Sequence, residues 1–292
     1  MRQVPAILVQ LAGVQVTQSA LTQEALRRAA GSAGAAYAQL RAAAPQAAAV
    51  HSDDTGWRVE GAPAQLMGFE TAAVTVYQVR EHHRNEEVPE VVPADYEGVL
   101  VTDRGRTDAA RERAGVRQQK CLAHLQRAIR AVLEQQPGPA RSFGSRLKAL
   151  GEQALDWWRE SHQGQRVGVA AQAGQLKEAI TPPLRDRPLK HPDNQRLLNK
   201  LGWHKERGNL LRFLDDPRIG PTNNRAERAL RPAVIARKVS QGSKNAQGAY
   251  AFAAFTSVVR TLVKSGTGSL VDGLLQVFRS AQMPDAPAAV CH

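Results

Sequence analysis

The sequence predicts an α/β protein in which a mixed sheet is flanked by helices and interrupted by a long helical segment. Residues 48–79 are rich in β-branched residues and turn signals, and the apolar run 98–102 adds a further strand. From about residue 108 to 216 the pattern is helical, with breaks at prolines. A group of strands followed by so long a helical stretch indicates a sheet-based core with a helical insertion.

The first elements follow from composition and spacing. Residues 21–44 are rich in alanine with apolar residues at helical spacing, and Pro45 ends this predicted helix. The next block reads as three antiparallel strands with a turn at 61–63. An acidic, proline-punctuated stretch at 81–97 predicts a short helix before the buried strand Val99–Thr102.

The later elements are predicted to be helical. Proline-containing breaks divide the insertion near residues 137–139, 181–183 and 191–192. Beyond it we expect a capped helix around Glu227, a loop at 240–248, an apolar helix near 249–263, an amphipathic helix near 269–280 and a disordered tail. The expected segments are an N-terminal helical part (1–47), a first core part (48–107), the insertion (108–217), a C-terminal core part (218–282) and the tail (283–292).

Charge and cysteine content restrict the class of protein. Lys and Arg number 39 against 27 Asp and Glu, and a net charge of +12 favours a polyanionic partner. Between Arg228 and Val271 there is no acidic residue, although a solvated helix surface explains that tract equally well if it is considered alone. No apolar run approaches the roughly 20 residues of a membrane span, and two cysteines are too few for a disulfide framework. We therefore expect a cytoplasmic protein.

Three acids stand at predicted element ends. Asp53 lies in the strand-rich block, Asp103 closes the apolar strand, and Glu227 lies in the capped helix. Singly, they could cap a turn, cap a helix and pair with a neighbouring arginine. Jointly, they match the carboxylates that Mg²⁺ needs for phosphodiester chemistry, in which two cations about 3.5–4 Å apart act together.

Several segments occur in the order found in a known family. The chain resembles the insertion-sequence-66 type of DDE transposases over most of its length. The most specific match is the run Asn-Asn-x-x-Glu-Arg-x-Leu-Arg-Pro. The matching segments are 53–59 (Asp-Asp-Thr-Gly-Trp-Arg-Val), 98–103, 121–127 (Cys-Leu-Ala-His-Leu-Gln-Arg), 223–232 and Arg237-Lys238.

The resemblance implies a transposase with an RNase H-like core, whose catalytic and metal-binding residues are Asp53, Asp103 and Glu227. Asp54 stands where the family usually has Glu, so the first ligand is open between Asp53 and Asp54. Two Mg²⁺ ions are expected, with Mn²⁺ able to substitute. One would activate water and then the freed 3′-hydroxyl, and the other would stabilise the departing oxygen.

DNA is the expected partner, both as element ends and as target. Asn223 and Asn224 read as helix caps, and a helix N-terminus also holds phosphate. Cys121 and His124 have metal-ligand spacing, but zinc is not expected because a structural site needs two further ligands. The expected DNA-binding residues are Asn224, Arg225, Arg228, Arg231, Arg237, Lys238 and Lys244, and the expected supporting residues are Asp54, Trp57, Cys121, His124 and Asn223.

The resemblance also leaves alternatives open. Family members usually carry a longer N-terminal region, so we expect either a truncated copy or end recognition from elsewhere. A truncated, non-catalytic DNA-binding remnant is the main alternative function, and a general RNase H-like nuclease is a third. The transposase interpretation implies a homo-oligomer on DNA, a nucleoid-associated location and no membrane partner.

Overall fold

A computed structural model describes the chain in two compact units. Unit 1 comprises Met1–Gln46, Asp54–His83 and Ala229–His292, and unit 2 comprises Ala47–Asp53 and Arg84–Arg228. Strand β1 (Ala49–Val59) and helix α8 (Asn224–Ser240) each begin in unit 2 and end in unit 1. The structure describes residues 4–80, 89–103, 115–136, 138–162, 169–216, 218–266 and 268–284.

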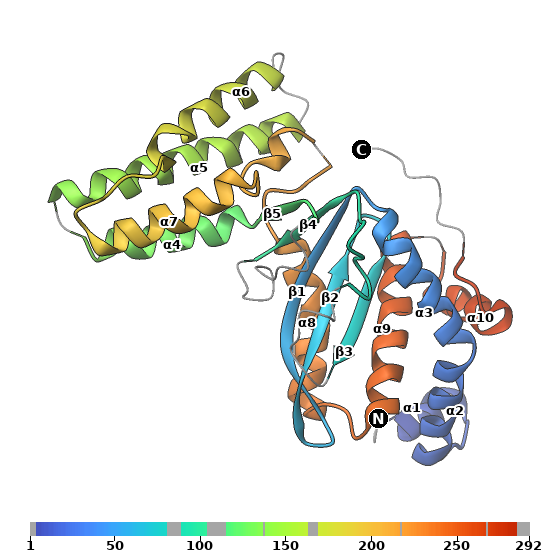
Figure 1. Ribbon diagram of the computed structural model, residues 1–292. Helices are drawn as coiled ribbons and strands as arrows, with labels where there is room; N and C mark the ends of the chain where they lie inside the picture. Colours follow the sequence, from blue (N-terminus) through green and yellow to red (C-terminus); the bar gives the residue numbers. More distant parts are fainter. Residues whose placement is uncertain are drawn as a thin grey trace. The chain divides into compact units, whose positions relative to one another are not determined.

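The described strands form one mixed five-stranded sheet in the order β3-β2-β1-β4-β5 (Figure 1). Strand β1 pairs in parallel with β4 (Val99–Thr102), and β4 pairs in parallel with β5 (Gln118–Lys120). Strands β2 (Ala62–Glu70) and β3 (Thr75–Arg80) are antiparallel. The predicted α/β class, a mixed sheet with flanking helices, is confirmed.

A two-residue loop joins β1 to β2. Both of its residues have positive φ, 55° at Glu60 and 81° at Gly61. Positive φ at both central residues is the mark of a type I′ turn, whose twist matches that of the strands it connects. Gly61 takes this conformation without steric penalty, whereas Glu60 takes it at some cost. The turn therefore sets the pairing of β1 with β2.

Helix α9 (Ala246–Ser265) closes the free edge of the sheet at β3, within unit 1. The backbone N–H of Thr75 donates to Thr261 Oγ1 at 3.1 Å, and that of Tyr77 donates to Ser257 Oγ at 2.8 Å. Ser257 and Thr261 are four residues apart, so they lie on one face of the helix. An edge strand with unpaired N–H groups invites pairing with another chain, and the two hydroxyls remove that liability.

Tyr77 anchors the core of unit 1. Its side chain is fully buried beside Trp57, and its hydroxyl donates to the carbonyl oxygen of Ala229 in α8. That bond lies in the turn where Pro232 provides no N–H to the helix. The hydroxyl of Tyr37 donates to the Tyr77 carbonyl oxygen at 2.6 Å. Burial raises the pKa of Tyr77 to about 12, so its hydroxyl remains a donor at neutral pH.

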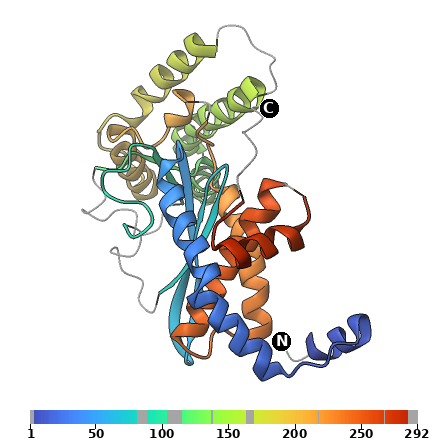
Figure 2. The same cartoon turned by 90° about the vertical axis from the view of Figure 1, so that its right-hand side faces the viewer.

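Helices α2 (Gln18–Ala30), α3 (Ser32–Ala43) and α10 (Leu270–Ser280) pack around α9 in unit 1. Helix α3 contacts α9 and β3, and Gly31 separates it from α2 where a single helix over 21–44 was expected. Helix α1 has no buried residue and lies apart from its neighbours in unit 1 (Figure 2). Helix α1 spans Val4–Ala12, and a short 3-10 helix spans Ala44–Gln46.

The four helices α4 to α7 follow β5 and precede α8 in the sequence, and within unit 2 they pack side by side (Figure 1). Their shared core includes Leu125, Trp157 and Leu198, all buried. The bounds are α4 Leu122–Glu134, α5 Arg141–His162, α6 Val169–Ile180 and α7 Pro192–Glu206, with 3-10 helices at Gly138–Ala140, Pro182–Leu184 and Arg212–Leu214.

The prediction of a helical region at 108–216 was wrong at one place. Strand β5 forms inside the region expected to be helical. Its middle residue, Gln119, is fully buried and uses its side chain to bind the backbone of Leu210 and Arg212. A buried strand made of polar residues carries no apolar alternation, so the pattern gave no sign of it. Residues 89–97 form turns, and the rest of the stretch in which a short helix was expected, 81–88, lies outside the described residues, as does the tail from 285.

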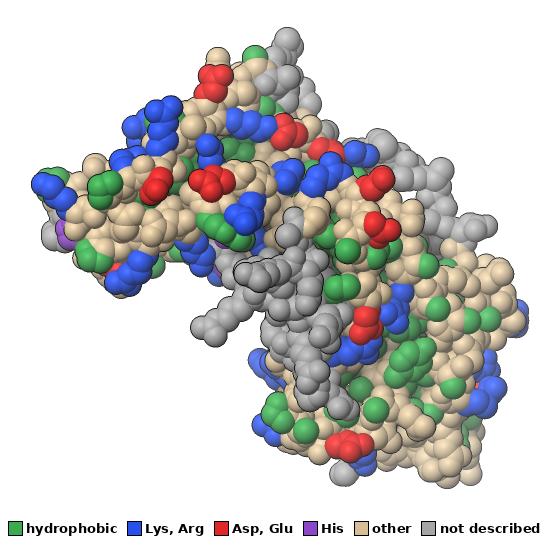
Figure 3. Space-filling view, in the orientation of Figure 1, with side chains coloured by type: hydrophobic (Ala, Val, Ile, Leu, Met, Phe, Trp, Pro, Cys, Tyr) green, Lys and Arg blue, Asp and Glu red, His purple; other side chains and the backbone are tan. Residues whose placement is uncertain are grey.

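Every helix in the described part of the chain is too short or too polar to span a bilayer. Lys and Arg side chains are scattered over the face shown in Figure 3 and do not gather into one patch. The charge surplus alone therefore does not locate a binding surface on that face.

Candidate functional site

Asp53 and Asp103 follow a pair of matched positions on neighbouring strands. Ser52 of β1 and Thr102 of β4 are register partners in a parallel pair, and each acid is the next residue along its strand. Both acids are partly exposed. Because parallel strands run in the same direction, the two acids lie at one edge of the parallel part of the sheet, at the carboxyl end of β4, while β1 continues to Val59. Open α/β sheets place their sites at the carboxyl ends of parallel strands.

The N-termini of two helices are fastened to this edge. The backbone N–H of Cys121, which precedes α4, donates to the carbonyl oxygen of Thr102 at 2.8 Å. The side-chain amide of Asn223, which precedes α8, donates to the carbonyl oxygen of Ser52 at 2.9 Å. The Asn223 N–H also donates to Cys121 Sγ at 3.2 Å. Both helices therefore start beside the residues that precede Asp53 and Asp103.

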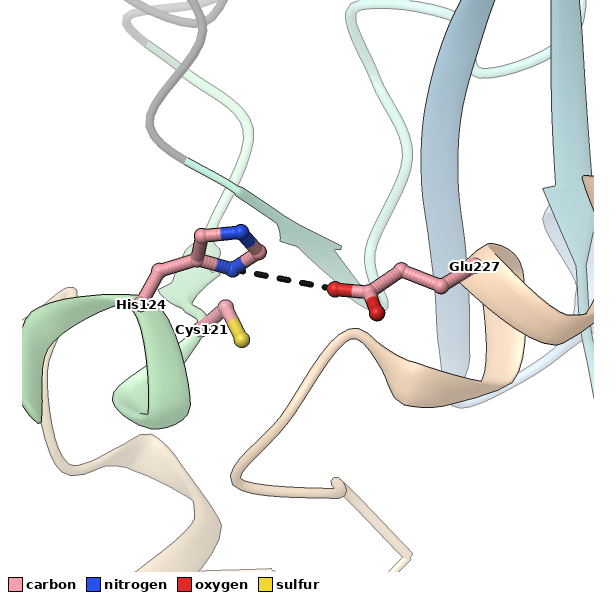
Figure 4. A group of neighbouring side chains, drawn as sticks. All are labelled: Cys121, His124 and Glu227. Carbon is pink, nitrogen blue, oxygen red and sulfur yellow. Dashed lines mark ion pairs between the residues drawn. The ribbon is translucent and has the colours of Figure 1, made fainter. Parts of the chain in front are cut away.

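Glu227 lies in the first turn of α8, and its N–H donates to the Asn223 carbonyl oxygen at 3.1 Å. Its Oε1 lies 3.8 Å from His124 Nδ1 and 3.9 Å from Arg127 Nη2 (Figure 4). Both distances exceed those of hydrogen bonds, so Glu227 is attracted to these groups without being fixed by them. The third acid thus arises from a helix that is tied to the edge carrying the other two.

Cys121, His124 and Glu227 form a compact group of possible metal ligands in unit 2. One ligand atom from each lies within 4.8 Å of the other two, and Figure 4 shows their side chains converging from the starts of α4 and α8. His124 Nε2 lies 2.9 Å from Arg127 Nη2. A guanidinium can only donate, so Nε2 accepts and the neutral ring carries its proton on Nδ1, toward Glu227.

Burial is the main cause that raises the pKa of the Cys121 thiol, and the charge of Glu227 adds to it. Backbone N–H groups, that of Asn223 first, lower the pKa in opposition. The raised pKa indicates a protonated thiol at neutral pH when no cation is present.

Lys120 was not recognised from the sequence. It is 1% exposed, and its Nζ donates to Thr102 Oγ1 at 2.9 Å, one residue before Asp103. This buried amine therefore fixes the side chain of the residue that precedes a predicted catalytic acid. In the sequence, the only indication of this role is that Lys120 lies in a polar run directly before Cys121. Arg127 was part of the matched motif, but its approach to Glu227 was not expected.

The sequence suggested that the Asn223 side chain caps α8, but the part of the chain that the structure describes shows no such cap. The amide nitrogen binds the Ser52 carbonyl oxygen instead, and Oδ1 has no hydrogen-bond partner among the described residues. Asn223 is fully buried, which explains why strand attachment replaces the expected cap. Asn224, Arg225 and Arg228 are exposed in the part of α8 that belongs to unit 2.

The basic residues of unit 1 fall into two groups. Arg231, Lys238 and Lys244 are exposed. Arg237 is partly buried and donates through Nη1 to Thr55 Oγ1, at 3.1 Å, and to the Gly56 carbonyl oxygen. Arg237 therefore fastens α8 to the β1 strand, a role that the prediction of a phosphate contact did not include.

A groove of about 690 Å³ lies beside this attachment in unit 1, lined by Arg58, Arg237 and Lys238 among others. Trp57 also borders it, but the ring is 3% exposed and stacks on Phe252 at 4.7 Å between centroids. Trp57 is thus a core residue, as expected. Asp54 is exposed and belongs to unit 1.

Comparison with known proteins gives one match. Neither the curated proteins nor the solved structures include a match to this chain. A family model described as "Transposase IS66 family" matches residues 2–251. The match covers Asp53 within β1, Asp103 directly after β4 and Glu227 in the first turn of α8. The chain belongs to the IS66 family of transposases.

Proposed function

We propose that this transposase cleaves DNA strands at the ends of an insertion sequence and joins them to target DNA in a reaction that depends on Mg²⁺. The supporting observation is the parallel register that makes Asp53 and Asp103 neighbours at one sheet edge. Asn223 ties the helix that carries Glu227 to the same edge. The mixed sheet supports an RNase H-like core, with α4–α7 as its helical insertion.

Asp53, Asp103 and Glu227 would hold the cations. Their carboxylates are the oxygen ligands that Mg²⁺ prefers, and the partial exposure of all three leaves room for the water that Mg²⁺ retains. Bound cations would supply an activated oxygen nucleophile and neutralise charge on the departing oxygen. The donor set therefore fits the expected metal.

The polypeptide itself would position the DNA. The starts of α4 and α8 present backbone N–H groups at this edge, and helix N-termini attract phosphate. The exposed Arg225 and Arg228 lie in the first turns of α8 and would contact phosphates without reading bases. These groups orient a strand, while the buried Lys120 holds the Thr102 side chain next to Asp103.

The test is Mg²⁺-dependent nicking of DNA that carries the element ends. Replacing Asp103 by Asn keeps the size of the side chain and removes the charge. We expect nicking to fall at least about 100-fold, because loss of partners outside the ligand set alone reduces metal binding or activity by about 10–100-fold. The matched control is Asp95→Asn, an exposed acid in the turn before β4, which should nick like the wild type. Equal nicking by Asp103→Asn and wild type would remove Asp103 from the mechanism.

A DNA-binding protein without catalysis is the second candidate, and one observation favours it. Glu227 faces His124 and Arg127, so the carboxylate can be retained by the His124 N–H and the Arg127 guanidinium instead of a metal. Salt-dependent DNA binding with no cleavage in Mg²⁺ or Mn²⁺ would support this function. Strand transfer by the purified chain would exclude it.

A further inference from the structure

Cys121, His124 and Glu227 supply the ligand set of a zinc-type site. Sulfur, imidazole nitrogen and carboxylate oxygen are the three donor types that Zn²⁺ binds, and three protein ligands with one open position is the arrangement of reactive zinc sites. The sequence offered only Cys121 and His124. The fold adds Glu227, which is remote in the chain, within 4.8 Å of both.

The ligand atoms lie within 4.8 Å of one another and must move closer to hold a cation. Tetrahedral Zn²⁺ with bonds of about 2.0–2.3 Å keeps its ligand atoms roughly 3.3–3.7 Å apart. His124 Nδ1 and Glu227 Oε1 are already 3.8 Å apart. The Asn223 N–H donates to Cys121 Sγ at 3.2 Å, which would stabilise a thiolate and fix its direction.

Donor chemistry separates this site from the Mg²⁺ site. Mg²⁺ binds oxygen and not thiolate, whereas Zn²⁺ accepts cysteine and histidine readily. Glu227 is the ligand that both sites would share. A cation bound to Cys121 and His124 would therefore hold Glu227 away from Asp53 and Asp103.

Arg127 competes with a cation for Glu227 and His124. Its guanidinium lies 3.9 Å from Glu227 Oε1 and binds His124 Nε2 at 2.9 Å. Binding through His124 Nδ1 would move the ring proton to Nε2, which would end the bond from Arg127. The Arg127 side chain is 62% exposed, so it can turn into solvent when the cation enters.

We propose that Cys121, His124 and Glu227 bind a thiophilic divalent cation, with Zn²⁺ as the probe, and that its binding inhibits DNA cleavage by capturing Glu227. The cation displaces the thiol proton, which passes to solvent. The inhibition rests on the proposed function, whereas the binding does not.

The experiment titrates the full chain with Co²⁺ and then Zn²⁺, without DNA or Mg²⁺. We expect one equivalent of Co²⁺ to produce a thiolate charge-transfer band and intense visible bands typical of four-coordination, which Zn²⁺ then abolishes. Cys121→Ser and His124→Ala should each weaken binding at least about tenfold. The matched control Cys291→Ser should bind as the wild type does. Arg127→Leu should bind about two- to fivefold more tightly, since it removes a competing surface charge.

Each outcome is decisive. No thiolate band in the wild type, or a band that survives Cys121→Ser and disappears in Cys291→Ser, overturns the site. Circular dichroism of each variant identifies a change that comes from misfolding. The ratio of nicking with and without Zn²⁺ then tests inhibition. If Asp103→Asn nicks like the wild type but the thiolate band is present, the proposed catalysis fails and the cation site stands.

Discussion

Two regions of the molecule differ in how completely their polar groups form hydrogen bonds. At the free edge of β3 in unit 1, Ser257 and Thr261 complete backbone hydrogen bonds at 2.8 and 3.1 Å. Beside Asp53 and Asp103 in unit 2, Glu227 approaches His124 and Arg127 only to 3.8 and 3.9 Å, and Asn223 Oδ1 has no partner among the described residues. Short, complete hydrogen bonds serve stability. Polar groups held close without being satisfied are available for binding.

Glu227→Gln should have the largest effect on activity, and it tests directly whether Glu227 serves binding rather than stability. We expect nicking of element-end DNA to fall about 100-fold or more, because the carboxylate charge is lost. The free energy of unfolding should change by less than about 0.5 kcal/mol, since the side chain is 37% exposed and its ion pairs are long. Glu152→Gln, whose carboxylate pairs with Lys148 on α5, is the control for both measurements. A large loss of stability with normal nicking would make Glu227 a structural residue.

Ser257→Ala should have the opposite character. The change leaves the buried N–H of Tyr77 without its partner, and we expect a loss of about 1–3 kcal/mol in the free energy of unfolding. Urea denaturation measures it. Ser280→Ala in α10 is the control, because that exposed hydroxyl donates to the Gln276 carbonyl oxygen one turn earlier and accepts from the backbone N–H of the exposed Gln282. A change of less than about 0.5 kcal/mol for Ser257→Ala would show that the β3 edge does not depend on this hydroxyl.

Alkaline pH should weaken each unit through a buried tyrosine. Burial raises the pKa of Tyr77 in unit 1 and of Tyr96 in unit 2 to about 12. Between about pH 10 and 12 the unfolded chain loses these protons while the folded chain keeps them, so stability falls as pH rises. Tyr77→Phe should lower the pH slope of the free energy of unfolding by an amount that corresponds to up to about one bound proton. Tyr96→Phe should lower it by a similar amount. Identical pH slopes in wild type and both variants would contradict the buried, protonated state.

Lys238→Ala should give the smallest effect. Lys238 is exposed beside the groove of unit 1, so a phosphate contact there predicts a salt slope of DNA binding lower by about 0.9. Lys190→Ala, which removes an exposed lysine from unit 2, is the control. An unchanged slope for Lys238→Ala would exclude that contact.

Much of the fold could be predicted because local patterns carry it. The strand Val99–Thr102 was predicted at its observed bounds, since a short apolar run before an acid marks a buried strand. The amphipathic helix expected near 269–280 is α10, and the segment between α8 and α9 lies within the loop expected at 240–248. Strand β5 was missed because its polar residues are buried by tertiary contacts, above all those of Gln119.

The candidate site was only partly predictable for the same reason. Each acid was identified from its motif, but its neighbours depend on pairings between distant segments. Asn223 binds Ser52 across 171 residues of sequence, and its N–H binds Cys121 across 102. No local pattern shows that Glu227 approaches His124, so the third ligand of the zinc-type site became visible only in the folded chain.

Cation binding by the three carboxylates is the central claim, and Mn²⁺ binding followed by electron paramagnetic resonance tests it most directly. The full chain should bind Mn²⁺ in a way that Mg²⁺ competes for, and Asp53→Asn, Asp103→Asn and Glu227→Gln should each weaken that binding at least about tenfold. Asp95→Asn should bind as the wild type does. Equal Mn²⁺ affinity in the wild type and all three variants would contradict the account.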